Sequence, residues 1–84
     1  MKVGIVGGGR AGTLFLKTLL EIPEVDVIGI CDKNPEAAAI VFAQEHGIPT
    51  YLVLKLFLEN DMDVVLELTG VPEVSNTIEQ FKKP

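Results

Sequence analysis

The chain has 84 residues, the size of one small domain with a single hydrophobic core. Apolar residues make up 48% and charged residues 23% of the sequence, which predicts a folded globular domain and not a disordered chain. The net charge of −5 argues against a surface that binds nucleic acid or an anionic membrane. No run reaches the ~18 apolar residues of a membrane-spanning helix. The single cysteine, Cys31, excludes a disulfide framework and a cysteine metal site, so we expect a cytoplasmic protein without a metal.

The start of the chain carries the strongest motif. An apolar run at residues 2–6 predicts a buried parallel strand, and a glycine cluster from Gly7 to Gly12 follows it with the pattern G-x-G-x-x-G. In that pattern Gly7 turns the chain out of the strand, Gly9 lets a pyrophosphate approach the backbone, and Gly12 lets the next helix pack closely. The helix predicted at residues 10–21 then offers free N–H groups and a positive dipole end to phosphates.

An acidic residue lies where the same fingerprint requires one. The apolar run at residues 25–31 predicts the second strand, and Asp32 follows it, about 20 residues beyond Gly12. Its carboxylate would accept hydrogen bonds from the adenosine ribose hydroxyls and repel a 2′-phosphate, so NAD is favoured over NADP. Arg10 and Lys33 are near enough in sequence to soften this preference, and we include both in the cofactor site. The alternative is that Asp32 is a helix-entry residue and the glycines form a plain tight turn.

Strands and helices continue to alternate along the chain. We expect a second helix at residues 35–46, with Asn34 as its N-cap, Pro35 at its first position and Gly47 ending it. This order predicts an α/β fold, a Rossmann-like three-layer half with four parallel strands in the order 3-2-1-4 and helices on both faces. The remaining predicted elements are an edge strand at 48–51, a helix at 52–60, a strand at 63–68 and a helix at 72–82.

The other polar and reactive side chains mostly have structural explanations. His46 lies in the last turn of a predicted helix, where it complements the dipole, and Cys31 fits a buried strand position. Asp61 and Asp63 fit a turn, since two carboxylates without further oxygen ligands do not make a metal site. Glu67 is the exception, because it is charged within a strand predicted to be buried. It could face the crevice at the carboxyl ends of the strands, pair with a lysine, or lie on an uncovered face.

Almost the whole chain resembles the N-terminal cofactor domain of the glucose-fructose oxidoreductase and inositol dehydrogenase (Gfo/Idh/MocA) family. The likeness rests on MKVGIVGGGRAG and VDVIGICDKNPEAAA, and on NDMDVVLELTGVPEV, which is similar to the family's fourth strand and following loop. The chain is also similar to the N-terminal domains of homoserine and aspartate dehydrogenase-type enzymes and dihydrodipicolinate reductases. The resemblance implies contacts of Gly7, Gly9, Arg10 and Ala11 with the pyrophosphate and of Asp32 with the adenosine ribose, and it places Thr69 and Gly70 near the nicotinamide-side ribose.

Members of that family continue into a fifth strand with a catalytic lysine in an E-K-P-type motif, and then into an α/β substrate domain. Lys83 matches that motif by letters only, at a predicted helix end with no strand before it, so we assign no catalytic residue. We expect residues 1–84 to be one dinucleotide-binding domain, an excised fragment or module of a larger protein, inactive by itself. The parent would be an NAD(P)-dependent oxidoreductase. The alternative is a non-catalytic regulatory, sensory or oligomerisation module of a signalling protein.

The run from Leu52 to Leu58 is too apolar for a short helix to bury on every side in so small a domain. The predicted sheet also has an open edge beside the strand at residues 63–68, which exposes backbone groups. We therefore expect a homodimer through the third or fourth helix or this edge, or contact with further domains of a parent protein. The alternative is that these leucines fill the end of the core.

Overall fold

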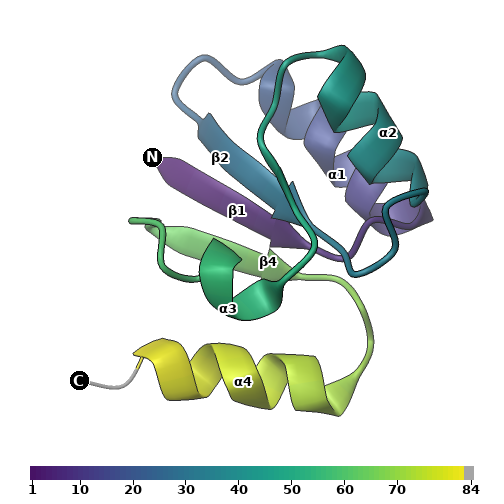
Figure 1. Ribbon diagram of the computed structural model, residues 1–84. Helices are drawn as coiled ribbons and strands as arrows, with labels where there is room; N and C mark the ends of the chain where they lie inside the picture. The colour runs from purple at the N-terminus through teal and green to yellow at the C-terminus, as the bar shows by residue number, and fades with distance from the viewer. Residues whose placement is uncertain (83–84) are drawn as a thin grey trace.

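A computed structural model describes residues 1–82, with the side chains of residues 1–80, and Lys83 lies outside the described residues. Four parallel strands form one sheet in the order β3-β2-β1-β4, which confirms the predicted topology (Figure 1). The elements are β1 (Lys2–Val6), α1 (Arg10–Leu20), β2 (Asp26–Cys31), α2 (Ala38–Glu45), β3 (Thr50–Tyr51), α3 (Leu54–Phe57), β4 (Val64–Glu67) and α4 (Pro72–Lys82).

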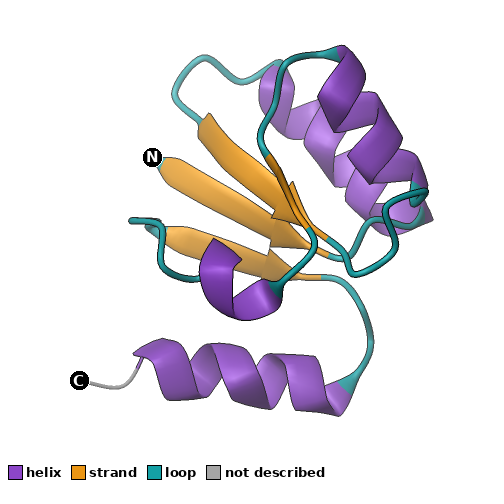
Figure 2. Cartoon of the chain, viewed as in Figure 1, coloured by secondary structure: helices purple, strands orange, loops and turns teal. Residues whose placement is uncertain are grey.

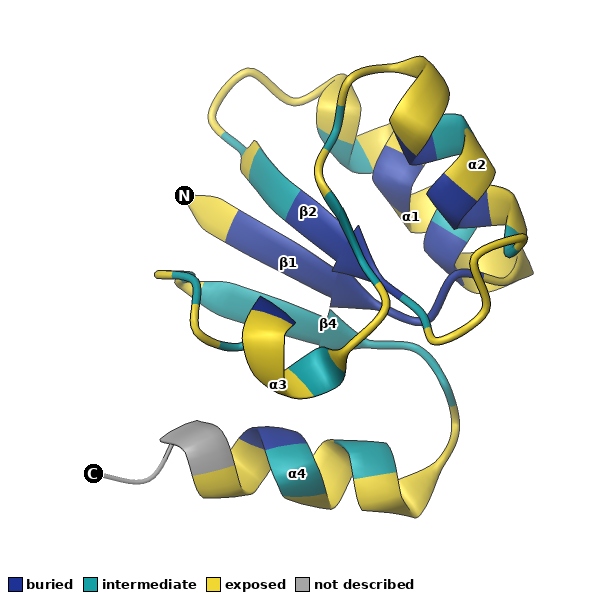
Figure 3. Ribbon diagram, in the orientation of Figure 1, coloured by how far each residue is buried: buried dark blue, intermediate teal, exposed yellow. Residues whose placement is uncertain are grey.

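Helices cover both faces of the sheet. Figure 2 shows α1 and α2 on one side, with α3 and α4 on the other. Neighbouring residues of β1 point to opposite faces, so Ile5 belongs to the core under α1 and α2 while Val6 belongs to the core under α3 and α4. This two-sided burial explains why the first strand is a continuous apolar run, and β1 is accordingly the darkest strand in Figure 3. None of the described helices has both the length and the apolar character needed to cross a membrane.

The second helix begins later than the sequence predicted. Ala37, not Asn34, is its N-cap, and no side chain caps it within the described chain. The Asn34 side chain is used locally, since its Oδ1 accepts a hydrogen bond from the Glu36 N–H at 3.0 Å in an Asx turn. The helix is instead anchored by a tertiary contact, in which the Ala39 N–H donates to the Gly8 carbonyl at 2.9 Å. The glycine cluster thus sets where α2 starts.

The two elements that follow are also shorter than predicted. β3 has only two residues, because it pairs at the edge of the sheet and Pro49 just before it has no N–H to donate. α3 has only four residues, and the Asn60 side chain closes its end by donating to the Phe57 carbonyl at 2.8 Å. Gly47 ends α2 as predicted, with a φ of +70°.

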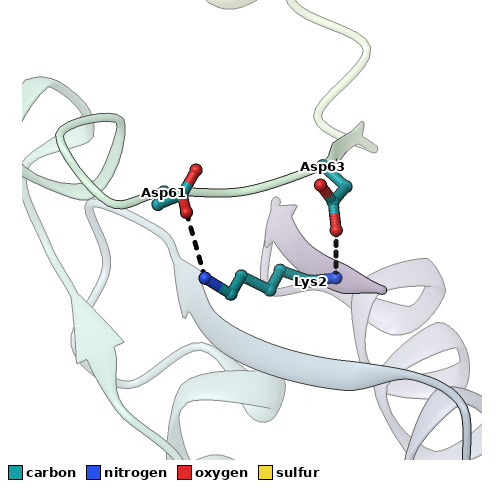
Figure 4. A network of polar contacts seen from close by, with 3 residues as sticks. All are labelled: Lys2, Asp61 and Asp63. Atoms are coloured by element: carbon teal, nitrogen blue, oxygen red, sulfur yellow. Dashed lines mark hydrogen bonds and ion pairs between the residues drawn. The ribbon is translucent and has the colours of Figure 1, made fainter.

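The amino ends of β1 and β4 are joined by Lys2 (Figure 4). Its backbone N–H donates to the Asp63 carboxylate at 2.7 Å, and its Nζ lies 3.0 Å from the carboxylate of Asp61, whose hydrogen bond and charge raise the pKa of Lys2. Both members of this ion pair are exposed, so it adds little stability. The two aspartates serve the turn before β4, as predicted, and the described residues contain no cluster of histidine, cysteine and acidic side chains that could hold a metal.

The packing of α1 on β1 depends on the absence of a side chain at Gly12. This residue is buried in the first turn of α1, and a Cβ built on it would overlap the carbonyl oxygen of Gly7. The helix therefore approaches the end of the strand as closely as backbone contact allows. Gly9, at the N-cap of the same helix, differs: a Cβ there would meet no atom within 4 Å.

We predict that Gly12→Ala lowers the free energy of unfolding by about 2 kcal/mol, because the added methyl group must displace backbone. Gly9→Ala is the matched control, and it should cost no more than about 1 kcal/mol, since alanine is only a poorer N-cap than glycine. Urea denaturation followed by circular dichroism measures both. Equal stability of the two variants would contradict the close contact between α1 and the end of β1 at Gly12.

Candidate functional site

A cleft of about 390 Å³ opens where β1, β2 and β4 end. This is the switch point of the sheet, because the strand that follows β1 in the chain, β2, lies on one side of it, whereas β4, which the chain reaches only after β3, lies on the other. A volume of this size is typical of small-molecule sites. The cleft is lined by Val6, Gly7, Gly8 and Gly9, by Cys31, Asp32 and Lys33, by Leu52 and Leu54, and by Leu68, Thr69, Val71 and Val74.

The glycine cluster forms a turn that only glycine allows. Gly7 has a φ of +114°, a conformation that side-chain-bearing residues rarely adopt, and its N–H donates to the Cys31 carbonyl at 2.9 Å. Gly9 lines the cleft, and no described atom occupies the space where its side chain would stand. The backbone of the turn is therefore open to a ligand at Gly9.

The start of α1 is electrostatically uncompensated. Gly9 is its N-cap, and within the described chain no side chain caps the helix and no acidic residue stands in its first turn. The first N–H groups of a helix have no intrahelical acceptors and carry a partial positive charge. Arg10 and Ala11, the first two residues of α1, are exposed. The arrangement suits a phosphate or pyrophosphate group.

Asp32 connects the end of β2 to the glycine turn. Its Oδ2 accepts a hydrogen bond from the Gly8 N–H at 2.6 Å, and its Oδ1 accepts one from the Asn34 N–H at 2.9 Å. The side chain is half-buried and lines the cleft. A carboxylate has about four lone-pair positions, so two bonds to backbone leave acceptor capacity for a ligand. Asp32 can thus shape the turn and also receive hydroxyl groups in the cleft.

The structure brings most of the predicted site residues to one cleft. Asp32 and Lys33 line it on the β2 side, Thr69 lines it on the β4 side, and Gly7 and Gly9 line it between them. The other predicted residues lie outside the lining: Arg10 and Ala11 in the first turn of α1, Gly12 buried beneath it, and Gly70 exposed in the loop after β4 with a φ of +70°.

The apolar walls of the cleft were not predicted from the sequence. Leu52 and Leu54 belong to the run that we interpreted as core filling or an association surface, yet both line the cleft. Val71 and Val74 also line it, from the loop after β4 and from α4. The apolar run itself was a signal for these walls. A short helix cannot bury so many apolar residues in the core, so some of them must cover another surface, and a ligand cleft is such a surface.

Cys31 and His46 take structural roles. Burial, together with the nearby charge of Asp32, raises the pKa of the Cys31 thiol to about 11, so it stays protonated at neutral pH. The predicted buried position of Cys31 is confirmed. His46 is the C-cap of α2, where its ring stacks on Phe42 and Nδ1 lies 2.9 Å from the Phe42 carbonyl oxygen.

Glu67 turns toward the loop after β4. Its Oε2 accepts hydrogen bonds from the backbone N–H and from the hydroxyl of Thr69, each at 2.5 Å. None of the three positions considered for Glu67 from the sequence included Thr69 as its partner. The acceptor and both donors are only two residues apart, so the hydrogen bonds form a local turn. The carboxylate therefore acts on a segment that lines the cleft.

We predict that Asp32→Ala lowers the free energy of unfolding by about 1–3 kcal/mol, because it leaves the buried Gly8 N–H without an acceptor. Asp32→Asn retains one carbonyl oxygen, so it should lose less than half of that amount. Chemical denaturation of the two variants beside the wild type gives the comparison. If alanine proved no worse than asparagine, the hydrogen bond would not be holding the turn.

Comparison with known proteins agrees with this geometry. The family model of the Gfo/Idh/MocA oxidoreductases, described as an oxidoreductase family with an NAD-binding Rossmann fold, matches residues 1–77. A search among curated proteins gives no match. The solved structure of the WlbA dehydrogenase from Bordetella pertussis, in complex with NADH and UDP-GlcNAcA, has a TM-score of 0.80 to this chain at 22% sequence identity.

That structural match covers 99% of this chain but only 27% of the dehydrogenase, so the two share the fold of one part of the longer protein. The family match, by contrast, extends over nearly the full sequence and includes the glycine turn, Asp32 and the loop after β4. The chain belongs to the Gfo/Idh/MocA oxidoreductase family, in its NAD-binding Rossmann domain.

Proposed function

We propose that the chain binds NAD(H) in the cleft at the carboxyl ends of its strands, as the cofactor part of a dehydrogenase. One observation carries the proposal: Gly9, which is both the open position of the turn and the N-cap of the uncompensated helix α1, borders the same cleft as the carboxylate of Asp32. The first suits the pyrophosphate of a dinucleotide, and the carboxylate suits a ribose. The dehydrogenase with a similar fold contains NADH, which supports the proposal.

Different residues of this chain would bind different parts of the cofactor. The N–H groups at the start of α1, from Gly9 to Ala11, would hold the pyrophosphate, and the absence of a side chain at Gly9 leaves room for it. Asp32 would accept hydrogen bonds from the adenosine ribose hydroxyls with its remaining lone pairs. When bound, the nicotinamide supplies hydride transfer, while these residues bind and orient the cofactor.

The apolar walls fit the rest of the ligand. Leu52, Leu54, Val71 and Val74 all line the cleft, so they would exclude water from an apolar or flat ring bound beside them. This surface also compensates for the acidic net charge, which repels a dinucleotide at long range. Affinity therefore has to come from short-range contacts with the backbone and with these side chains.

We propose that NAD is preferred over NADP. The Asp32 carboxylate is held toward the cleft by two backbone N–H groups, so it cannot easily turn away from a 2′-phosphate. We expect the repulsion between this carboxylate and a 2′-phosphate to exceed the attraction of Lys33 for the phosphate, because Lys33 is exposed and solvent weakens its charge interactions.

We predict that NADH binds with a dissociation constant at least about tenfold lower than that of NADPH, as measured by calorimetry. Gly9→Val should weaken NADH binding by about tenfold or more, because its side chain fills space the pyrophosphate needs. Thr18→Val is the matched control, since it places valine on the exposed surface of the same helix away from the cleft. No heat and no thermal shift with saturating NADH would contradict the proposal.

We also propose that the chain self-associates through the α3 side of the sheet. Leu52, Val53 and Leu56 are 47%, 52% and 54% exposed there, and β4 is an edge strand of the described sheet. Exposed apolar side chains and an unpaired strand edge are each typical of association surfaces.

Leu56→Glu should shift the chain from a dimer to a monomer in size-exclusion chromatography with light scattering, because a buried charge disfavours an apolar interface. Leu14→Glu is the control, as Leu14 is 65% exposed on α1, across the sheet. A wild-type chain that stays monomeric at high concentration would rule the dimer out, and equal effects of both substitutions would place the interface elsewhere.

A further inference from the structure

The loop between β4 and α4 is held by one carboxylate. Glu67 ends β4 and stands beside Val6 of β1, at the strand end that leads into the glycine turn. Its Oε2 accepts both the N–H and the hydroxyl of Thr69, and the Thr69 hydroxyl oxygen in turn accepts the Val71 N–H at 3.0 Å. Val71 directly precedes Pro72, the first residue of α4. The hydrogen bonds therefore run from the end of β4 to the start of α4.

This arrangement decides what the Thr69 hydroxyl can do. A hydroxyl has one proton to donate, and here that proton goes to Glu67. One of its lone pairs already receives the Val71 N–H. Thr69 lines the cleft, yet its hydroxyl has no proton left to donate to a ligand. Its role is then to connect Glu67 to the loop.

Glu67 is suited to this role because it is charged. The side-chain hydrogen bond from Thr69, with backbone bonds from Thr69 and Gly70, lowers the pKa of the Glu67 carboxyl, so it is ionised at neutral pH. Hydrogen bonds to an ionised acceptor are about twice as strong as those between neutral groups. An uncharged residue of the same length would hold the loop less firmly.

The loop lies on one particular side of the cleft. Asp32 and Lys33 border the cleft at the end of β2, whereas Thr69 and Val71 border it beyond β4, with the glycine turn between them. A dinucleotide with its pyrophosphate at the start of α1 and its adenosine ribose at Asp32 therefore extends its other half toward Thr69. The position of residues 69–71 limits the space for that half.

We propose that Glu67 is a positioning residue for the nicotinamide half of the bound dinucleotide, acting through Thr69 on the course of residues 69–71 along the cleft. This inference rests on the proposed function, because it needs a dinucleotide in the cleft. Glu67 itself does not contact the ligand. Its replacement should therefore weaken the binding of only the part of the ligand that reaches the β4 side.

The test compares NADH with ADP, which carries the adenosine and the diphosphate but not the nicotinamide half. Calorimetry of the full chain with Glu67→Leu and Thr69→Val should show about tenfold weaker NADH binding, with the ADP constant unchanged within about twofold. Glu67→Gln keeps an acceptor oxygen and should fall between wild type and leucine. Thr69→Ser keeps the hydroxyl and should bind NADH as the wild type does. The double variant Glu67→Leu/Thr69→Val should be no weaker than either single one, since both break the same link.

The outcomes separate this inference from the function on which it rests. If the wild type binds neither NADH nor ADP, the proposed function fails and this inference fails with it. If NADH binds but the variants weaken NADH and ADP equally, or change neither, Glu67 has only a structural role or none. Thermal melts of every variant identify loss of folding. If leucine at position 67 unfolds the chain, the Glu67→Gln and Thr69→Ser pair still decides, because NADH binding must weaken in the first and not in the second, while ADP binding stays the same in both.

Discussion

The hydrogen bonds of Gly8 connect the parts of the molecule that form the cleft. Its N–H donates to the Asp32 carboxylate at the end of β2, and its carbonyl accepts the Ala39 N–H in the first turn of α2. The N–H and the carbonyl of Gly8 therefore join the glycine turn to the end of β2 and to the start of α2. A Cβ at Gly8 would lie 2.9 Å from the Cβ of Ala37 and 3.1 Å from the Asp32 carboxylate, so the contact favours glycine at this position although the G-x-G-x-x-G pattern leaves it free.

At both ends of the cleft a carboxylate accepts hydrogen bonds from the neighbouring backbone. On the β2 side Asp32 accepts backbone N–H groups and so sets the glycine turn, and on the β4 side Glu67 accepts both donors of Thr69 and so sets the following loop. In each case a carboxylate at the end of a parallel strand orients backbone that borders the ligand space. The chain thus uses negative charges to organise a site for an anionic ligand, and the start of α1 supplies the compensating positive potential.

The fold could be predicted from the sequence because its signals are local and periodic. Apolar runs gave the strands, the alternation with helices gave the parallel order, and the glycines marked the turn at Gly7. The start of α2 could not be predicted, because the contact with Gly8 is tertiary and overrides the N-cap that Asn34 offers. The walls formed by Leu52 and Leu54 were missed for a similar reason, since sequence shows that a residue is apolar and not which surface it covers.

We propose that the glycine turn, the start of α1 and Asp32 act together as one dinucleotide site. The most direct test is a titration of the ¹⁵N-labelled chain with NADH, followed by amide chemical shifts. We expect saturable shifts at Gly8, Gly9, Arg10 and Ala11, with further shifts at Lys33 and Thr69 on the two sides of the cleft. An unchanged spectrum at saturating NADH, or shifts confined to the outer surfaces of α1 and α2, would contradict it.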